Sequence, residues 1–296
     1  MVTIRKRTKG NEEFYYLEHS IRKGEVLEKK EKYLGKEIPK NIEEVKKEFF
    51  HDIFKERWHK TLDAIKQTFS KEYRAMPKSA QEKYLEHFMI KFTYDTNRIE
   101  GSTLNLHDTA NLLKDGISPP NKPIRDIKET EAHKRIFYEM LNYKKDISLT
   151  EVLYWHKMLF EDSDKEIAGK IRKHQVAIAG ADVELPLPVE VPILFDEFFK
   201  WYHKEKKKLH PVELAALVHL KFVSIHPFTD GNGRISRLLM NFVLQKNKYP
   251  MLNIQYTNRA AYYRALERSQ KTKREYIFVQ YIIKRYIAAY KKRTMY

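Results

Sequence analysis

The sequence predicts a mainly α-helical protein with a small antiparallel β meander at its N-terminus and one β-hairpin near the middle. Three observations support this prediction. Apolar residues recur at a helical period over most of the chain after Pro39. Capping-box signals occur at Asn41, Ser79 and Ser148, each followed three residues later by a glutamate. Runs of β-type composition are confined to the first 35 residues and to a stretch around Gly180.

The N-terminal part of the chain contains three β-type runs, at residues 2–4, 14–17 and 26–34. Gly10 and Gly24 lie between consecutive runs, where tight turns need residues that tolerate unusual backbone angles. Because the connections are short, we expect neighbouring runs to pair as an antiparallel meander.

Helical periods account for most of the remaining chain. The first long helix starts at Asn41 and keeps its apolar stripe as far as Ile65, and the second starts near Ser79 and ends at Gly101. The further helices are expected at residues 124–143, 148–159, 193–203, 212–225, 233–246, 258–269 and 275–290.

One segment between the helices has a different composition. Residues 175–178 and 183–185 are rich in β-branched and apolar residues, and they flank Gly180 and Ala181. A proline-rich segment follows. This arrangement predicts a β-hairpin.

The composition excludes several classes of protein. The chain has 296 residues and no cysteine, which rules out disulfides and Cys-bound zinc. No apolar run approaches about 18 residues and the N-terminus lacks a signal-peptide core, so we expect no membrane span and a cytoplasmic location. The formal net charge is +17, but lysines alternate with glutamates along most of the chain. We interpret this charge as solvated helix faces and expect no nucleic-acid partner.

The segment that carries chemistry is residues 226–237, between two apolar helices. Gly231 and Gly233 stand at a helix start, where small residues let a ligand approach the free backbone N–H groups. Arg234 and Arg237 lie three residues apart, so both can face one anion. The pattern predicts an anion site at the N-terminus of this helix.

Two further side chains extend the anion site towards phosphoryl chemistry. Asp230 supplies a hard carboxylate oxygen, which suits Mg²⁺ shared with phosphates. His226 is placed to take a proton from an attacking hydroxyl group. A base, a metal ligand, a phosphate cradle and cationic side chains are the parts that phosphoryl transfer requires.

Ordinary structural roles explain each of these residues singly. His226 and Pro227 can end a helix, Asp230 and Gly231 can form a turn, and Asn232 can cap the next helix. Such roles do not explain why a base, an acid and two arginines crowd one glycine-rich helix start, so we favour the phosphate site. His156 and His219 lie on apolar helix faces, and we expect them to support the core rather than bind metal.

Residues 226–237 resemble the signature of the Fic family, H-P-F-x-D-G-N-G-R-x-x-R, at every fixed position. The segment that begins at Gly169-Lys170-Ile171-Arg172 is similar to the family's region before its flap, and the expected hairpin resembles the flap itself. The resemblance covers residues 80–285 and implies a Fic-type helical bundle. It divides the chain into a β meander at residues 1–38, a helical region at 39–120 and a Fic catalytic core at 121–296.

The resemblance implies a protein adenylyltransferase, an enzyme that transfers AMP from Mg-ATP to a hydroxyl side chain of a target protein. It makes His226 the general base and Asp230 the ligand of Mg²⁺. The target protein would pair with the flap at residues 175–188 by strand addition. The enzyme itself is a further candidate target. Assembly of the chain into a homo-oligomer is a further expectation that the sequence leaves undecided. The nucleotide-binding residues that the resemblance implies are Gly231, Asn232, Gly233, Arg234 and Arg237.

A second motif, residues 96–101, resembles the family's inhibitory motif [S/T]-x-x-x-E-[G/N]. Thr96 and Glu100 are one helical turn apart on one face. The resemblance implies that Glu100 pairs with Arg237 and occupies the site of the γ-phosphate. In some relatives this glutamate also serves to remove AMP from the target. The sequence therefore leaves both AMP addition and AMP removal as activities of this chain. The ordinary alternative is a solvated glutamate at a helix end.

Two other classes of function remain as alternatives. One is transfer of a phosphate, phosphocholine or another nucleotide on the same fold. Gly231 and Gly233 argue against the kinase branch of the family, which differs at these glycines. The other is a non-enzymatic regulator that binds a nucleotide or nucleic acid, as the net charge suggests. A winged-helix segment that many relatives carry after the core is not expected here, because the chain ends at Tyr296.

Overall fold

The computed structural model describes residues 2–23, 26–178, 180 and 182–291. The chain divides into two compact units, Met1–Asp63 and Ala64–Tyr296, and the division falls inside helix α1, Ile42–Ala75. None of the helices in the described part of the chain is long and apolar enough to cross a bilayer.

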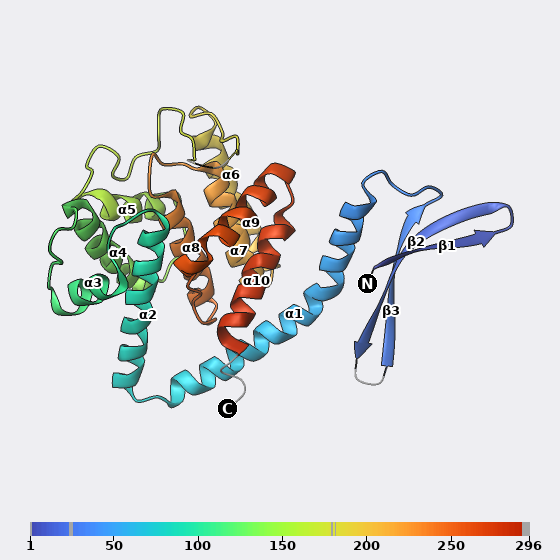
Figure 1. The fold of residues 1–296 in the computed structure, drawn as a ribbon, viewed down its shortest axis with the longest axis horizontal. Coiled ribbons are helices and arrows are strands. Elements are labelled where there is room, and N and C mark those ends of the chain that lie inside the picture. Colours follow the sequence, from blue (N-terminus) through green and yellow to red (C-terminus); the bar gives the residue numbers. More distant parts are fainter. Residues whose placement is uncertain (1, 24–25, 179, 181, 292–296) are drawn as a thin grey trace. The chain divides into compact units, whose positions relative to one another are not determined.

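The first unit contains the predicted meander. Strands β1 (Thr3–Lys9), β2 (Glu12–Lys23) and β3 (Val26–Gly35) form an antiparallel sheet in the order β1-β2-β3 (Figure 1). Leu17 in the central strand is fully buried, and Phe49 of α1 is nearly so. The ring of His19 lies 5.7 Å from that of Phe50. The sheet therefore packs one face against α1, and the prediction of an N-terminal meander is confirmed.

The second unit is helical (Figure 1). Helices α7 (Pro211–Ile225) and α8 (Asn232–Lys246) pack against each other at its centre, and most residues of both are buried. The predominantly apolar surface of α7 is expected of a helix in a core, whereas α8 also buries polar side chains such as those of Arg234 and Arg237. The other elements are α2 (Lys78–Ile99), α3 (Leu106–Ala110), a π-helical turn (Asn111–Asp115), α4 (Ile124–Asn142), α5 (Leu149–Phe160), α6 (Val191–Glu205), a 3-10 turn (Tyr256–Asn258), α9 (Arg259–Thr272) and α10 (Glu275–Lys291).

The helices agree with the prediction of a mainly α-helical fold, but some boundaries differ. Ser148 caps α5 as expected, because its side chain accepts the N–H of Glu151. Helix α2 begins at Lys78, within one residue of the expected start, but Ser79 does not cap it. Pro77 takes the N-cap position, and no side chain caps the helix. The helix α3 was not expected, although Asn105 and Asp108 form a complete capping box.

The predicted β-hairpin at residues 175–188 is wrong as a pair of strands. Its turn was placed at Gly180–Ala181 beside Ala179, and Ala179 and Ala181 lie outside the described residues. None of the described residues in this segment belongs to a strand. The two arms are joined by side chains instead, because Gln175 donates to the carbonyl of Leu185 and Arg172 donates to the carbonyl of Pro186.

Candidate active site

The turn between α7 and α8 brings the signature residues into one compact loop. His226 ends α7 in the left-handed region, with φ of 52°, and Gly231 precedes α8 with φ of 81°. The side chain of Asn232 closes the loop, because it accepts the N–H of Phe228 at 2.9 Å and donates to the carbonyl of Phe228 at 2.8 Å. Asn232 therefore offers only its main chain to a ligand.

The first turn of α8 presents free main-chain donors. The first hydrogen bond of the helix runs from the N–H of Ile235 to the carbonyl of Gly231. The N–H groups of Asn232, Gly233 and Arg234 precede this bond, so they point out of the helix end. A phosphate at this position would gain both their hydrogen bonds and the helix dipole.

His226 is held as a neutral base. Its Nδ1 atom lies 3.2 Å from the carbonyl of Val223, which places the ring proton on Nδ1 and leaves a lone pair on Nε2. Burial lowers the pKa of His226 below its usual value of 6.5, and the charge of Arg172 lowers it further. The imidazole is therefore ready to accept a proton near neutral pH.

Asp230 is surrounded by positive charge at the edge of the loop. Its carboxylate accepts the N–H of Gly231, and its Oδ2 atom lies 2.6 Å from Nη2 of Arg125. Arg234 lies 3.4 Å from Oδ1. Burial raises the pKa of Asp230, but these three groups outweigh burial and hold the pKa below its usual value. The side chain is 39% exposed, so a ligand can reach it.

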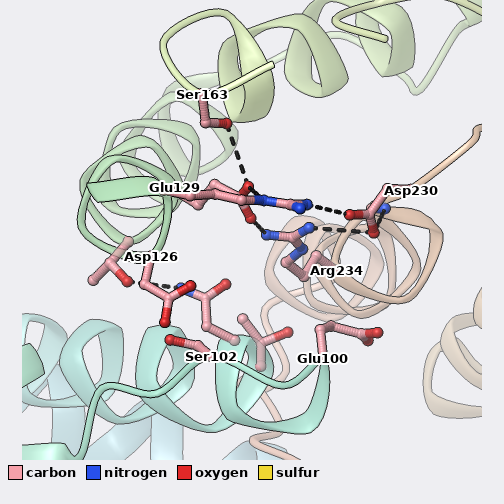
Figure 2. A network of polar contacts seen from close by, with 12 residues as sticks. Glu100, Ser102, Asp126, Glu129, Ser163, Asp230 and Arg234 are labelled. Carbon is pink, nitrogen blue, oxygen red and sulfur yellow. Dashed lines mark hydrogen bonds and ion pairs between the residues drawn. The ribbon is translucent and has the colours of Figure 1, made fainter. Parts of the chain in front are cut away.

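Arg234 is held in place by a carboxylate of another helix. Glu129 of α4 forms a buried ion pair with Arg234, and it also accepts hydrogen bonds from Arg125 and Ser163. Glu129, Asp230 and Arg234 converge from α4 and from the start of α8 (Figure 2). The ring of Phe160 lies against the guanidinium of Arg234. These contacts orient Arg234 before any ligand binds.

Arg237 binds the end of α2. Its Nε donates to the hydroxyl of Thr96 at 2.7 Å, and its Nη2 lies 2.6 Å from Oε1 of Glu100. A Cβ atom placed on Gly233 would lie only 2.1 Å from the same Oε1. The carboxylate of Glu100 therefore sits directly over the first turn of α8, where the free N–H groups are.

Among the side chains of the signature loop, one carboxylate is available as a protein ligand for a metal ion. Within the described residues no group of three or more His, Asp or Glu side chains could hold a metal ion. Asp230 nevertheless offers a partly exposed carboxylate beside the phosphate-type site, and Mg²⁺ is often held by one carboxylate together with substrate phosphates. The residues thus fit Mg²⁺ that arrives with a nucleotide.

His156 supports the loop rather than binding a ligand, in line with the role expected for it. Its Nδ1 accepts the N–H of Gly169 at 3.0 Å, so its Nε2 donates to the carbonyl of Asp230 at 3.0 Å. Burial lowers the pKa of His156 to about 4, which keeps this ring neutral. The ring also stacks on Phe228 at 3.7 Å.

Arg172 connects two parts of the candidate site through contacts that the sequence did not reveal. It is almost fully buried, and its guanidinium donates to the carbonyls of His226, His174 and Pro186, at 2.8, 3.1 and 2.6 Å. The main-chain N–H of Arg172 donates to the carbonyl of Pro227. Arg172 therefore ties the flap segment, residues 175–188, to the loop that carries His226.

Arg125 and Glu129 were also missed. They lie about one hundred positions before the signature, and each is bonded to a residue of the signature 105 positions away. Their spacing of four residues on one helix is a common pattern of surface ion pairs, so nothing in it points to a site.

Two hollows border this loop. A polar pocket of 250 Å³ lies between the end of α2, the start of α4 and the start of α8, and Asp230 and Arg234 line it. A larger cavity of 1080 Å³ lies under the flap segment, between α6, α7 and the residues around α9. Ser224 and Ile225, which precede His226, line the larger cavity.

Comparisons with known proteins agree with this geometry. Residues 146–244 match the sequence profile of the Fic/DOC family. The chain is 34% identical over 217 residues to the protein adenylyltransferase Fic of Aedes aegypti, which covers 72% of this chain and 42% of that protein. It is 32% identical over 199 residues to the protein of the same name from Nematostella vectensis, covering 66% of this chain and 45% of that protein. The chain thus spans less than half the length of these curated relatives.

Solved structures show the same fold. A Fic domain containing signaling protein from Bacteroides thetaiotaomicron superimposes with a TM-score of 0.68 at 28% identity, covering 77% of this chain and 94% of that one. Residues 134–508 of Fic-1 from C. elegans superimpose with a TM-score of 0.72 at 25% identity, covering 86% of this chain and 76% of that one.

Proposed function

This chain belongs to the Fic/DOC family, and we propose that it is a protein adenylyltransferase that transfers AMP from Mg-ATP to a hydroxyl side chain of a target protein. One observation carries the proposal. A neutral histidine, an accessible carboxylate and the free N–H groups of a helix start lie in a single loop closed by Asn232. The names of the curated relatives support the same activity.

In the proposed reaction, His226 Nε2 takes the proton of the target hydroxyl as its oxygen attacks the α-phosphorus. A P–O bond forms to the target, the bond to the β-phosphate oxygen breaks, and pyrophosphate leaves. Mg²⁺ bound at Asp230 would offset the negative charge on the phosphates. Arg172 supports the base, since it fixes the carbonyl of His226 and keeps the imidazole neutral.

The phosphates would lie on the first turn of α8. The N–H groups of Asn232 and Gly233 supply hydrogen bonds, and Gly231 and Gly233 let the phosphates come close. Arg234, which Glu129 already orients, would clamp them. Arg237 would contact the γ-phosphate. The convergence of these donors on one helix end supports this assignment, which the resemblance to the family implies.

Glu100 would restrain the reaction. Its carboxylate lies over Gly233 and on Arg237, so it competes with an anion for the same donors. Thr96, which lies on α2 one turn before Glu100, accepts a hydrogen bond from Arg237 and so holds the arginine beside Glu100. ATP that binds beside Glu100 would hold its α-phosphate away from the line of attack. Removal of AMP, with Glu100 positioning a water, is the second activity that this placement favours.

The target would bind along the flap segment, residues 175–188. The main chain of its described arms is not paired in a strand, so an extended segment can add to it. The cavity under the flap has an apolar floor that includes Phe198, Trp201 and Ile225. A side chain next to the target hydroxyl would enter this cavity. We propose the enzyme itself as a further target, and the cytoplasm as the location.

A nucleotide titration with Mg²⁺ and mass spectrometry of the chain after incubation with Mg-ATP test this function. A mass increase of one AMP on the chain or on a candidate target supports adenylyl transfer, whereas an added phosphate points to phosphoryl transfer on the same fold. ATP binding without any modification of the Glu100→Gly variant or of its targets would favour a nucleotide-binding regulator.

A further inference from the structure

Arg125 differs from the two arginines of the signature. The side chains of Arg234 and Arg237 are only 4% and 1% exposed, and each is fixed by several partners. The side chain of Arg125 is 54% exposed, at the first turn of α4. Ion pairs of an exposed arginine are weak, so the side chain can change partners.

Arg125 occupies the free oxygen of Asp230. Oδ1 of Asp230 accepts the N–H of Gly231 and faces Arg234, whereas Oδ2 is bonded to Nη2 of Arg125 at 2.6 Å. A divalent cation that uses Asp230 must reach one of these oxygens. Because two positive groups at one oxygen repel each other, the metal and Arg125 exclude each other at Oδ2.

Arg125 stays near the site when it releases Asp230. Its Nε is bonded to Glu129 at 2.6 Å, and Glu129 is itself fixed by Arg234. The guanidinium can therefore turn about this anchor. It lines the polar pocket of 250 Å³ next to the helix start where phosphates are expected.

We propose that Arg125 exchanges partners during nucleotide binding. It neutralises Asp230 while no metal is present, and it moves to the terminal phosphates of a nucleoside triphosphate when Mg²⁺ takes Asp230. Arg125 is then a positioning residue that sets how much Mg²⁺ the site needs. This inference rests on the proposed function, because it requires a metal-bound nucleotide at Asp230.

Calorimetric titration of ATP into the wild type and into Arg125→Gln tests the exchange. Titrations are run at a series of Mg²⁺ concentrations and with a chelator. The glutamine keeps a polar side chain near Glu129 but carries no charge. We expect the Mg²⁺ concentration for half-maximal effect to fall about twofold to fivefold, because the competing cation is gone. With the chelator, the affinity for ATP should fall about tenfold, because Asp230 loses the cation that neutralises it and its negative charge then repels the phosphates.

Arg135→Gln is the matched control. Arg135 lies on the same helix, is 45% exposed and pairs with Asp162 at 2.6 Å, away from the loop. This variant should match the wild type in every titration. Arg125→Lys, which keeps the positive charge, should stay within about twofold of the wild type in its Mg²⁺ requirement.

An unchanged or increased Mg²⁺ requirement in Arg125→Gln would overturn the exchange. A merely structural ion pair would lower the melting temperature and weaken ATP binding without reducing the need for metal. If the wild type binds ATP and only the Arg125 effects are missing, the proposed function stands and the inference fails. If the wild type binds no nucleotide at any Mg²⁺ concentration, both fail.

Discussion

Oε1 of Glu100 lies 2.6 Å from Nη2 of Arg237, and 137 positions separate the two residues in the sequence. The contact joins the end of α2 to the first turns of α8, over the free N–H groups of that helix. Arg237, the proposed partner of the γ-phosphate, is therefore already bound to an acidic side chain of the same chain.

The pair predicts a non-additive effect of two substitutions. Glu100→Gly frees Arg237 for the γ-phosphate, so AMP incorporation should rise about tenfold to hundredfold. Arg237→Ala in that background should cancel the gain, because both changes act on one contact. The assay is AMP incorporation in the wild type, both single variants and the double variant. A gain that survives in the double variant would show that Glu100 acts elsewhere.

His226→Ala should abolish AMP transfer and leave ATP binding nearly unchanged. A general base acts on the target hydroxyl and does not contact the nucleotide, and its loss costs about 10² to 10⁴ in rate. Rates and calorimetric affinities are compared with those of His203→Ala, an exposed histidine on α6. Equal labelling by His226→Ala and the control would remove His226 from the mechanism.

The rate should depend on pH through the neutral form of His226. Burial lowers the pKa of His226, so the rising limb of the pH–rate profile should lie below pH 6.5. Arg172 also lowers this pKa, so Arg172→Gln should move the limb to higher pH, whereas Arg172→Lys keeps a charge and should move it less. A limb that is the same in both variants would contradict the electrostatic role of Arg172.

Asp230→Asn should remove the Mg²⁺ dependence of ATP binding. The carboxylate is the one protein ligand that the described loop offers to the metal, and an amide is a much weaker ligand for Mg²⁺. Asp196→Asn on α6 is a suitable control, since this carboxylate is exposed and bonded to Lys200 on the same helix. If Asp230→Asn responds to Mg²⁺ like the control, another group holds the metal.

Much of this site could be predicted because its chemistry is contiguous in sequence. Residues 226–237 form one loop and the first turns of the following helix, so a local pattern was sufficient to propose the anion site, the base and the metal ligand. Arg125, Glu129 and Arg172 act through contacts that only the packed helices create. Glu100 was recognised through its resemblance to a known motif, since a glutamate at a helix end is uninformative by itself.

The fold was predictable where the apolar periodicity is strong. It was less predictable where individual side-chain contacts set the local structure. The long helices and the meander follow from apolar spacing and glycine turns. The start of α2 was placed to within one residue, but the capping role of Ser79 was wrong, because Pro77 takes the N-cap position. The flap was expected as paired strands, but Arg172 and Gln175 hold its arms through side-chain bonds that composition does not reveal.

The central claim is AMP transfer restrained by Glu100, and one labelling experiment tests it most directly. Glu100→Gly and the wild type are each incubated with Mg-ATP that is labelled either at the α-phosphate or at the γ-phosphate. The account predicts strong protein labelling from the α position and none from the γ position, with Glu100→Gly exceeding the wild type. Label that arrives from the γ position, or equal labelling in the two proteins, would contradict it.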